Sequence, residues 1–421
     1  GWLRVAAGDI DGAVERTEPL TKKSGFGIFH KLHIALMYDI AGRAEDARAA
    51  YEEAIDLAGQ PTLRLVWLAG NFFERNGDKA RAEALYRGLL ENTPNSSVMD
   101  AVLRKAHTGK RPEAVVRGVP DGFAETMFNL GSLLSQERAE EVALIYTHLA
   151  LWLNPDLIVA RILLGEILQS QQRGAQAIAV YRDVPGDSPF DWLARLRIAE
   201  ELGRLERIDE ASVELEALAA LRPHRFEPLL RLGNLLRGEE RFEEAAGAYD
   251  RAVARIETPE RRHWMLYYFR GIVLERLERW PDAEKDFLLA LDLEPEQPFV
   301  MNYLAYSWIE KKLHLDKAKG MLARAVELRP DDGYIVDSLG WVYYRLGKYA
   351  KGVTFLERAV ELRPQDPVIN DHLGDAYWRV GRRQEARFQW RRALSLGPED
   401  DLAPELESKI DSGLNKSPED I

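Results

Sequence analysis

The chain contains no cysteine, and this absence removes several kinds of chemistry at once. Without thiols it has no disulfide, no thiolate zinc ligand and no cysteine nucleophile. It also lacks an apolar run as long as a membrane-spanning helix needs, about 18 residues. An excess of positive charge is missing as well, because 57 basic side chains stand against 69 acidic ones. Since affinity for nucleic acid comes mostly from clustered Lys and Arg, we do not expect a general nucleic-acid binder.

Sequence motifs of catalytic and metal sites are equally scarce. No GxGxxG, GxSxG or HExxH occurs. The stretch 108–112 resembles the end of a phosphate-binding loop, but Arg104 and Arg111 stand where that loop needs Gly and Ser or Thr. His30 and His33 have the spacing of two metal ligands on one helix face, yet no third ligand follows, so we expect an ordinary solvated helix. The sequence therefore predicts a protein that is not an enzyme and holds no metal or cofactor.

What the chain does have is the composition of a folded protein. Of its 421 residues, 46% are hydrophobic and 30% are charged. Disordered chains have far fewer apolar residues. The sequence opens with GWLRVAAGDI, which contains neither Met nor a signal-peptide pattern. We therefore expect further residues to precede it in the full protein, so that a targeting segment is not visible here.

A short pattern recurs along most of the chain at a nearly constant spacing. It is anchored by a small residue at Ala35, Gly70, Gly131, Gly165, Ala199, Gly233, Gly271, Ala305, Gly340 and Gly374. From Gly131 onward the steps are 34, 34, 34, 38, 34, 35 and 34 residues. A second small residue follows twelve positions later in most repeats, as at Ala143 and Ala386, and many repeats end on Pro, as at Pro94 and Pro364. A fixed period of this length is typical of repeat arrays.

Each repeat reads as two helices. In residues 333–366, Leu339, Gly340, Tyr343 and Leu346 fall on one stripe at helical spacing. Gly347 then interrupts the helix, a second apolar stripe follows, and Pro364 ends it. Neither helix pair can bury its apolar face alone, so neighbouring pairs must stack into a continuous core. The predicted fold is an all-α solenoid of stacked helix-turn-helix repeats.

This pattern resembles the tetratricopeptide repeat. Residues 367–400 carry its positions as Leu373, Gly374, Tyr377, Ala386, Trp390, Ala393 and Pro398. The preceding repeat departs from the pattern only at Gly352, where the family usually has Ala. The resemblance implies an interaction scaffold that binds other proteins, because the family is a generic binding architecture.

Irregular stretches divide the array. We interpret residues 1–27 as the second half of a truncated repeat, 28–96 as two repeats and 124–400 as eight repeats. Residues 97–123 are rich in Gly and Pro and shorten the period, which predicts two short helices joined by a loop. This stretch is either a degenerate repeat that bends the array or a hinge. Residues 401–421 hold a capping helix near 402–410 and a frayed acidic tail.

The resemblance places the first helix of each pair on a concave surface. Helical spacing then gives the side chains that face a partner, on the side opposite the Leu339 and Tyr343 stripe. These predicted partner-binding residues are Tyr268, Phe269, Asn302, Tyr303, Tyr306, Glu310, Tyr334, Asp337, Trp341, Tyr344, Arg345, Asp371, His372, Asp375, Trp378 and Arg379. Aromatic residues are frequent binding hot spots, so we expect a protein or peptide segment with apolar and basic residues to dock there. The alternative is that the aromatics only fill space between adjacent first helices.

Two finer resemblances bear on the partner. The Lys, Asn and Arg clamp with which chaperone-binding members hold a peptide carboxylate is absent, because Asp337, Trp341, Asp371 and Asp375 occupy the corresponding first-helix positions. The last third of the chain is similar to the carboxyl-terminal repeats of long bacterial envelope repeat proteins. Some of those are similar to adaptors that deliver substrates to a periplasmic processing protease. The resemblance implies a periplasmic or envelope-associated adaptor, and the alternative is a cytoplasmic assembly or regulatory platform.

Overall fold

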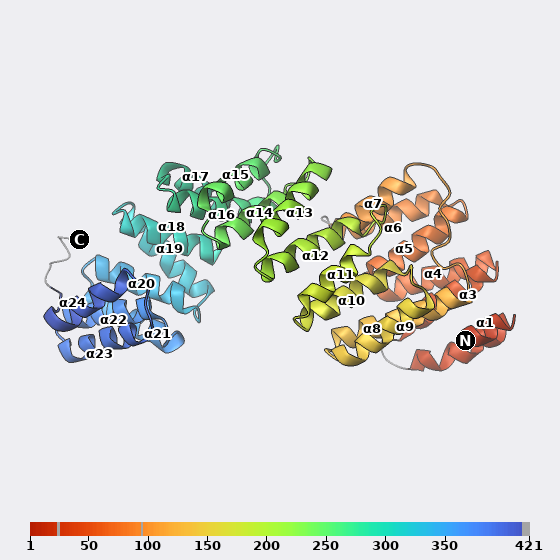
Figure 1. Ribbon diagram of the computed structural model, residues 1–421, viewed down its shortest axis with the longest axis horizontal. Helices are drawn as coiled ribbons and strands as arrows, with labels where there is room; N and C mark the ends of the chain where they lie inside the picture. Colours follow the sequence, from red (N-terminus) through yellow and green to blue (C-terminus); the bar gives the residue numbers. More distant parts are fainter. Residues whose placement is uncertain (23–25, 94–95, 415–421) are drawn as a thin grey trace. The chain divides into compact units, whose positions relative to one another are not determined.

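The structure is a computed structural model, and it describes residues 1–22, 26–93 and 96–414. All regular secondary structure in these residues is helical, which confirms the predicted all-α fold (Figure 1). The chain divides into two compact units, Gly1–Leu235 and Leu236–Ile421. The division falls inside one helix, α14 (Glu227–Gly238).

Unit 1 contains thirteen α-helices before α14 among its described residues. They are α1 (Trp2–Ala6), α2 (Ile10–Thr17), α3 (Gly27–Ile40), α4 (Ala44–Ala58), α5 (Leu63–Arg75), α6 (Lys79–Asn92), α7 (Ser97–Ala106), α8 (Val119–Gln136), α9 (Glu140–Leu153), α10 (Ile158–Ser170), α11 (Gly174–Arg182), α12 (Asp191–Arg204) and α13 (Ile208–Leu221). A short 3₁₀ helix, η1 (Glu18–Lys22), follows α2.

Unit 2 continues the alternation of first and second helices. Its helices after α14 are α15 (Phe242–Val253), α16 (Trp264–Arg276), α17 (Trp280–Leu293), α18 (Pro298–Glu310), α19 (Leu315–Leu328), α20 (Gly333–Arg345), α21 (Tyr349–Leu362), α22 (Pro367–Arg379), α23 (Arg383–Ser395) and α24 (Leu402–Ser412). A 3₁₀ turn, η2 (Arg261–His263), precedes α16.

The small residue of each repeat is explained by the packing of the two helices in a pair. A Cβ atom added to Gly271 or Gly374 would come within 3.0 Å of the ring of Phe287 or Trp390, which lies sixteen residues later on the second helix. Gly70 meets Tyr86 and Gly165 meets Tyr181 at the same spacing. The glycine therefore makes room for a large buried side chain of its partner helix. The second small residue packs into the same core, where Ala143, Ala283 and Ala386 have no exposed surface.

The turn between the two helices of a pair uses one backbone conformation throughout. The residue seven positions after the small residue has a positive φ in every repeat: Gly42, Gly77, Arg138, Gln172, Glu206, Glu240, Glu278, Lys312, Gly347 and Gly381. Glycine adopts this left-handed conformation freely, whereas a residue with a Cβ is strained there by roughly 1–2 kcal/mol. The tight turn is thus imposed by the pairing of the helices, even where the sequence offers no glycine.

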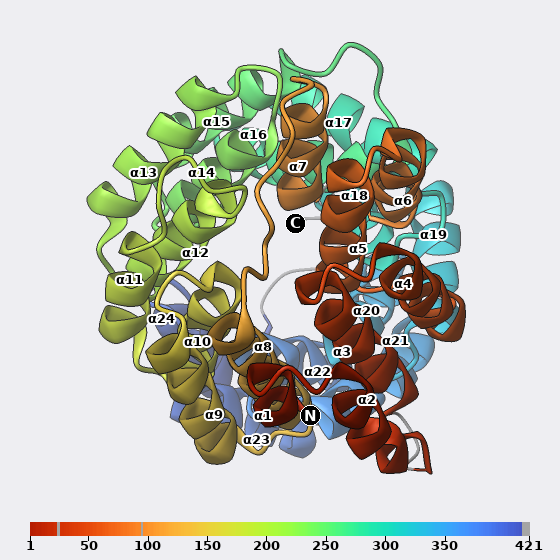
Figure 2. The ribbon, with the colours of Figure 1, turned by 90° about the vertical axis from the view of Figure 1, so that its right-hand side faces the viewer.

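Unit 1 brings together segments that are far apart in the sequence. Residues 107–118 form no helix and run as an extended segment from α7 to α8, as Figure 2 shows. The Asn71 side chain on α5 holds this segment by donating to the Glu113 carbonyl at 2.9 Å and accepting from the Val115 amide at 3.3 Å. The Trp2 indole of α1 donates to the Thr126 hydroxyl of α8 at 3.0 Å. The early helices are therefore fastened to α8.

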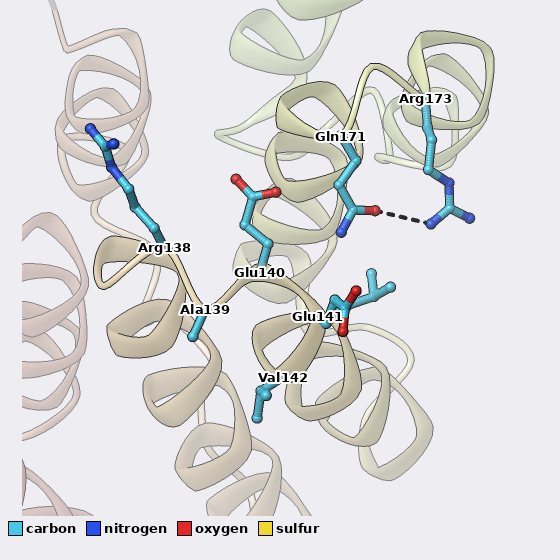
Figure 3. Close-up of a pocket in the computed structure, with 8 residues that line it drawn as sticks. Arg138, Ala139, Glu140, Glu141, Val142, Gln171 and Arg173 are labelled. Atoms are coloured by element: carbon cyan, nitrogen blue, oxygen red, sulfur yellow. Dashed lines mark hydrogen bonds between the residues drawn. The ribbon is translucent and has the colours of Figure 1, made fainter.

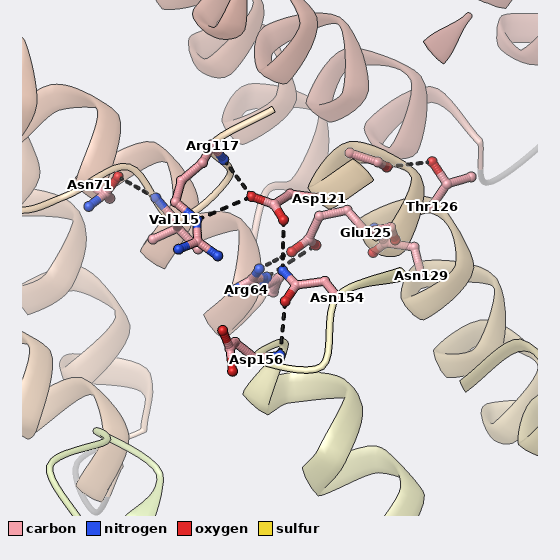
Figure 4. A network of polar contacts seen from close by, with 11 residues as sticks. Arg64, Asn71, Val115, Arg117, Asp121, Glu125, Thr126, Asn129, Asn154 and Asp156 are labelled. Carbon is pink, nitrogen blue, oxygen red and sulfur yellow. Dashed lines mark hydrogen bonds and ion pairs between the residues drawn. The ribbon is translucent and has the colours of Figure 1, made fainter. Parts of the chain in front are cut away.

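A buried ion pair lies at the centre of these long-range contacts. The Arg64 guanidinium of α5 donates to both carboxylate oxygens of Glu125 on α8, and both side chains are almost fully buried (Figure 4). Nearby, Asp121 accepts from the Asn154 amide at 3.0 Å and from the Arg117 backbone at 2.8 Å. Arg64 also lies over the Trp67 ring. The ion pair joins α5 to α8 through residues that are 61 positions apart in the sequence.

The structure refines one interpretation of unit 1 and corrects another. Residues 97–123 contain the short helix α7, the extended segment 107–118 and the first residues of α8, so two helices are joined by a loop as expected, but the second helix is long. His30 and His33 are buried, not solvated, because α3 packs with the His33 ring against Phe29 and the edge of Trp2. Burial lowers the pKa of His33 to about 3. Pro94 and the predicted tail at 415–421 lie outside the described residues.

A candidate groove on the first helices of unit 2

A pocket of about 380 Å³ opens on unit 2, and four successive first helices line it. Its lining comes from the end of α16 and from α18, α20 and α22: Glu275, Arg276, Asn302, Tyr303, Tyr306, Ser307, Glu310, Lys311, Tyr334, Asp337, Ser338, Val368 and His372. Seven of these were predicted from the sequence as partner-binding residues: Asn302, Tyr303, Tyr306, Glu310, Tyr334, Asp337 and His372. The prediction that first helices face a common surface agrees with this arrangement.

Three tyrosines give the pocket its apolar wall. Tyr303 packs edge-on against Tyr268 at 6.2 Å between ring centroids, and its hydroxyl donates to Glu275 at 3.4 Å. Burial, followed by the nearby Glu310 carboxylate, raises the pKa of the Tyr306 phenol above its ordinary value. Tyr334 is the most exposed of the three, with the Arg363 guanidinium over its ring at 4.7 Å. Burial likewise raises the pKa of the Tyr303 phenol, so Tyr303 and Tyr306 stay uncharged at neutral pH.

The acidic side chains of the pocket already have partners within the chain. Glu310 accepts from the Trp341 indole at 3.0 Å and forms an ion pair with Arg345 at 3.3 Å. Asp337 contacts the Nδ1 atom of His372 at 2.9 Å. Burial alone would lower the pKa of His372, but Asp337 together with Asp371 and Asp375 outweighs burial and raises that pKa above the ordinary value. A basic residue of a partner would therefore compete with these internal pairs.

The Asn302 carboxamide is the one polar group lining this pocket that is buried and unsatisfied. Its oxygen is buried and accepts no hydrogen bond from any residue that the structure describes. A buried acceptor without a donor costs roughly 1–3 kcal/mol. Asn71 in unit 1 shows what such a side chain can do, since it binds the backbone of an extended segment with both its oxygen and its nitrogen. Because the Asn302 oxygen is out of reach of solvent, a partner's N–H does not reach it while the side chain keeps this orientation.

Comparison with known proteins agrees with this architecture. The profile of the tetratricopeptide repeat family matches residues 39–97, 196–261, 230–298 and 311–367, together just over half of the chain. The chain belongs to the tetratricopeptide repeat family. Proteins of this family are interaction scaffolds, and the repeats indicate the same general role for this chain.

The tetratricopeptide repeat protein is similar to a curated relative and to solved structures. It is 29% identical over 196 residues to the TPR repeat-containing protein PA4667 of Pseudomonas aeruginosa, a match that covers 46% of this chain and 32% of the relative. The chain thus spans about a third of that relative's length. Among solved structures, YrrB, "a TPR protein with an unusual peptide-binding site", is 21% identical with a TM-score of 0.36, over 46% of this chain and 97% of YrrB. The Cut9–Hcn1 complex of the APC/C is 14% identical with a TM-score of 0.49, over 97% and 94%.

The groove prediction fails at its carboxyl-terminal end. Asp371 and Asp375 are buried, because α24 packs against this end of the repeats and inserts Lys409 between them. The Lys409 ammonium lies 2.8 Å from Asp371 and 3.1 Å from Asp375. Burial, followed by the neighbouring Asp371, raises the pKa of Asp375 to about 7. These carboxylates anchor the terminal helix and do not face a partner.

Tyr344 and Trp341 also need correction. Tyr344 is buried in the core, whereas Tyr343, predicted as core, is only partly buried. The half-buried Trp341 ring is stacked between Tyr344 at 4.6 Å and His372 at 4.0 Å. This stack explains why Trp341 lies beside the pocket without lining it. The predicted stripe is correct at Leu339 and Gly340, which are buried, and it is wrong in the last turns of α20, where Tyr344 takes the core position expected of Tyr343.

The remaining predicted residues take structural positions around the pocket. Trp378 packs on Trp390 at 5.4 Å and lies against Gly413 beyond α24. Arg379 donates to the Tyr344 hydroxyl at 3.4 Å, and Arg345 pairs with Glu310. Tyr268 and Phe269 belong to an aromatic cluster on α16, with the Arg237 guanidinium over Phe269 at 4.7 Å. Their binding role stays a prediction.

Some pocket residues were missing from the predicted set. Arg276 is the last residue of α16, and Lys311 directly follows α18. Val368 stands in the first turn of α22. Helix termini are hard to assign to a face from periodicity alone, because the stripe ends there. Among the residues that the structure describes, no group of acidic, His or Cys side chains could hold a metal ion. In the same residues, no helix is long and apolar enough to cross a membrane.

Proposed function

We propose that this tetratricopeptide repeat protein is a non-enzymatic adaptor that holds an extended segment of a partner protein in the pocket on α16, α18, α20 and α22. The observation that carries the proposal is the joint lining of one pocket by four consecutive first helices. Because the helices that line the pocket are already folded, binding mainly costs the conformational entropy of the extended segment itself. Apolar side chains of the segment would contact Tyr303, Tyr306 and Tyr334.

Basic residues of the segment mainly raise the rate at which it associates with the protein. The chain has a formal net charge of −12, so a positively charged segment is attracted to it at a distance. At the pocket itself, Glu310 and Asp337 are already paired with Arg345 and His372. We therefore expect the on-rate to fall with added salt while the dissociation rate changes little.

We further propose that the adaptor works in the bacterial envelope and presents its partner to another protein, such as a periplasmic processing protease. This rests on the resemblance of the last third of the chain to envelope repeat proteins. The similarity to a Pseudomonas aeruginosa protein supports a bacterial setting. The second candidate is a cytoplasmic assembly platform, which the same repeats would serve equally well.

One experiment tests the binding site and the compartment together. The wild-type chain and the Tyr306→Ala variant are used to capture partners from envelope and cytoplasmic fractions, with Phe388→Ala on α23 as a control on an exposed second helix. A partner that is captured from the envelope by wild type and Phe388→Ala, and at least about 10-fold more weakly by Tyr306→Ala, supports the proposal. Equal capture by all three chains contradicts binding in the pocket. Capture from the cytoplasmic fraction alone contradicts a role in the envelope.

A further inference from the structure

Helix α9 in unit 1 carries an apolar stripe that no described residue covers. Val142, Ile145, Leu149 and Trp152 are 44%, 59%, 42% and 78% exposed, respectively. The opposite face of the same helix is buried in the array through Ala143, Thr147 and Ala150. The helix is thus apolar on both sides. No other helix of the described chain exposes more than two large apolar side chains. A helix that is apolar all round is normally covered on both sides.

The spacing of the stripe identifies the kind of surface that fits it. Its four residues follow one another by three, four and three positions, which is the a and d spacing of two consecutive heptads. Side chains spaced in this way form a narrow seam along a helix. Such a seam packs against another α-helix crossing at a shallow angle, with knobs fitting into holes. The occupant is therefore a helix.

We infer that the occupant is α9 of a second copy of this chain, in antiparallel orientation. The stripe is symmetric about residue 147, so an antiparallel copy places Val142 opposite the partner copy's Trp152 and Ile145 opposite its Leu149. Every layer then combines one a and one d residue, and the smallest side chain of the stripe meets the largest. A two-fold axis requires this kind of self-complementary surface.

A pocket lies where this arrangement places the partner copy's tryptophan. Val142 lines an open pocket of about 850 Å³ together with Leu144, with Arg138 and Glu140 on one side and Gln171 and Arg173 on the other (Figure 3). Arg173 donates to the Gln171 carboxamide at 3.1 Å and borders the pocket. An exposed indole that enters a pocket is a typical anchor of an interface. By symmetry each copy supplies one tryptophan and one pocket, so the dimer contains two such anchors.

Sedimentation of the 421-residue chain over a range of concentrations tests the inference. Wild type should form a reversible dimer, and Trp152→Ala and Ile145→Asp should each weaken it by at least about 30-fold. Val213→Asp on α13 is the matched control, because Val213 is 70% exposed on another second helix and lies outside the stripe. Far-ultraviolet circular dichroism checks that each variant is folded. A wild-type chain that stays monomeric, or a dimer that neither variant weakens, overturns the inference.

The absence of cysteine allows a direct test of the register. Chains with Ile145→Cys and chains with Leu149→Cys are mixed and mildly oxidised. In an antiparallel pair these positions face each other closely enough for a disulfide, so the mixture should cross-link far more than either variant alone. Cross-linking of each variant with itself indicates a parallel pair and contradicts the register. Loss of phosphatidylcholine vesicle binding in Ile145→Asp, with no dimer in wild type, would assign the stripe to a membrane surface and overturn the inference.

Discussion

The two units of this protein use the same repeat but stabilise it differently. In unit 2, after α14, the main contacts between the described helices stay within two helices along the chain, as between α18 and α20 or α23 and α24. In unit 1, α1 and α3 also contact α8, and α7 contacts α12. Unit 2 therefore behaves as a stack in which each pair depends on its neighbours, whereas unit 1 depends on contacts that close long loops of chain.

This difference indicates which contacts of a repeat protein cost the most stability when they are removed. A nearest-neighbour stack loses stability locally when one contact is removed, because distant repeats do not feel the loss. A unit closed by long-range contacts loses several interfaces together. Arg64, Glu125 and Trp2 in unit 1 are such closing contacts, whereas Lys409 in unit 2 fastens only one terminal helix.

The largest expected effect comes from breaking the closing ion pair of unit 1. Glu125→Ala leaves the buried Arg64 guanidinium without its partner, and we expect a loss of about 3–5 kcal/mol in unfolding free energy. Chemical denaturation measures this loss, and hydrogen exchange should show faster exchange throughout α1 to α8. Arg64→Met combined with Glu125→Leu should recover most of it, because no buried charge remains. Glu210→Ala, which removes an exposed partner of Arg207, is the control and should change nothing measurable.

A smaller and more local effect is expected at the end of unit 2. Lys409→Met removes the cation between the buried Asp371 and Asp375, and we expect a loss of about 3 kcal/mol that is confined to α22–α24. Hydrogen exchange should accelerate there and stay unchanged in α16–α18. Because the pKa of Asp375 is raised already in the wild type, its carboxyl protonates as pH falls, so the loss should shrink toward pH 5. A loss of protection throughout unit 2 would contradict the nearest-neighbour account.

The pH dependence of unit 1 should contain a contribution from His33. Burial lowers its pKa to about 3, whereas an unfolded histidine titrates near 6.5. The unfolded state therefore binds more protons between these values, and unit 1 loses up to about 1.4 kcal/mol per pH unit as pH falls below about 6.5. His33→Leu should remove this slope without lowering stability at pH 7. An unchanged slope in the variant would show that other groups cause the acid sensitivity.

The smallest effect tests the turn that both units share. Glu278 adopts a positive φ in the turn of its repeat, whereas Gly347 occupies the equivalent position two repeats later. Glu278→Gly relieves the backbone strain and should stabilise unit 2 by roughly 0.5–1 kcal/mol. The reverse change, Gly347→Glu, should destabilise it by a similar amount. Thermal unfolding of both variants measures the pair, and equal midpoints would mean that the turn carries no strain.

Much of the fold could be predicted from the sequence because the repeat is a local pattern. The small residues Gly374 and Ala386 let the two helices of one pair pack closely. Their recurrence is visible in the sequence because this packing is decided within the pair. Helical periodicity also placed seven residues of the pocket on one face, and their binding role stays a prediction. The carboxyl-terminal end of the groove was missed because burial of Asp371 and Asp375 depends on a helix that no longer follows the repeat. Long-range contacts such as the one between Arg64 and Glu125 leave no periodic trace in the sequence.

The central claim, that the first helices of unit 2 hold a partner segment, is tested most directly by site-specific photo-crosslinking in cells that produce the protein. A photoreactive phenylalanine analogue replaces Tyr334, which lines the pocket and is 49% exposed, or Phe388 on α23, which is 64% exposed and lies outside the pocket. The account predicts a discrete adduct with a partner from position 334 and none from position 388. An adduct from position 388 alone would contradict it and move the binding surface to the second helices.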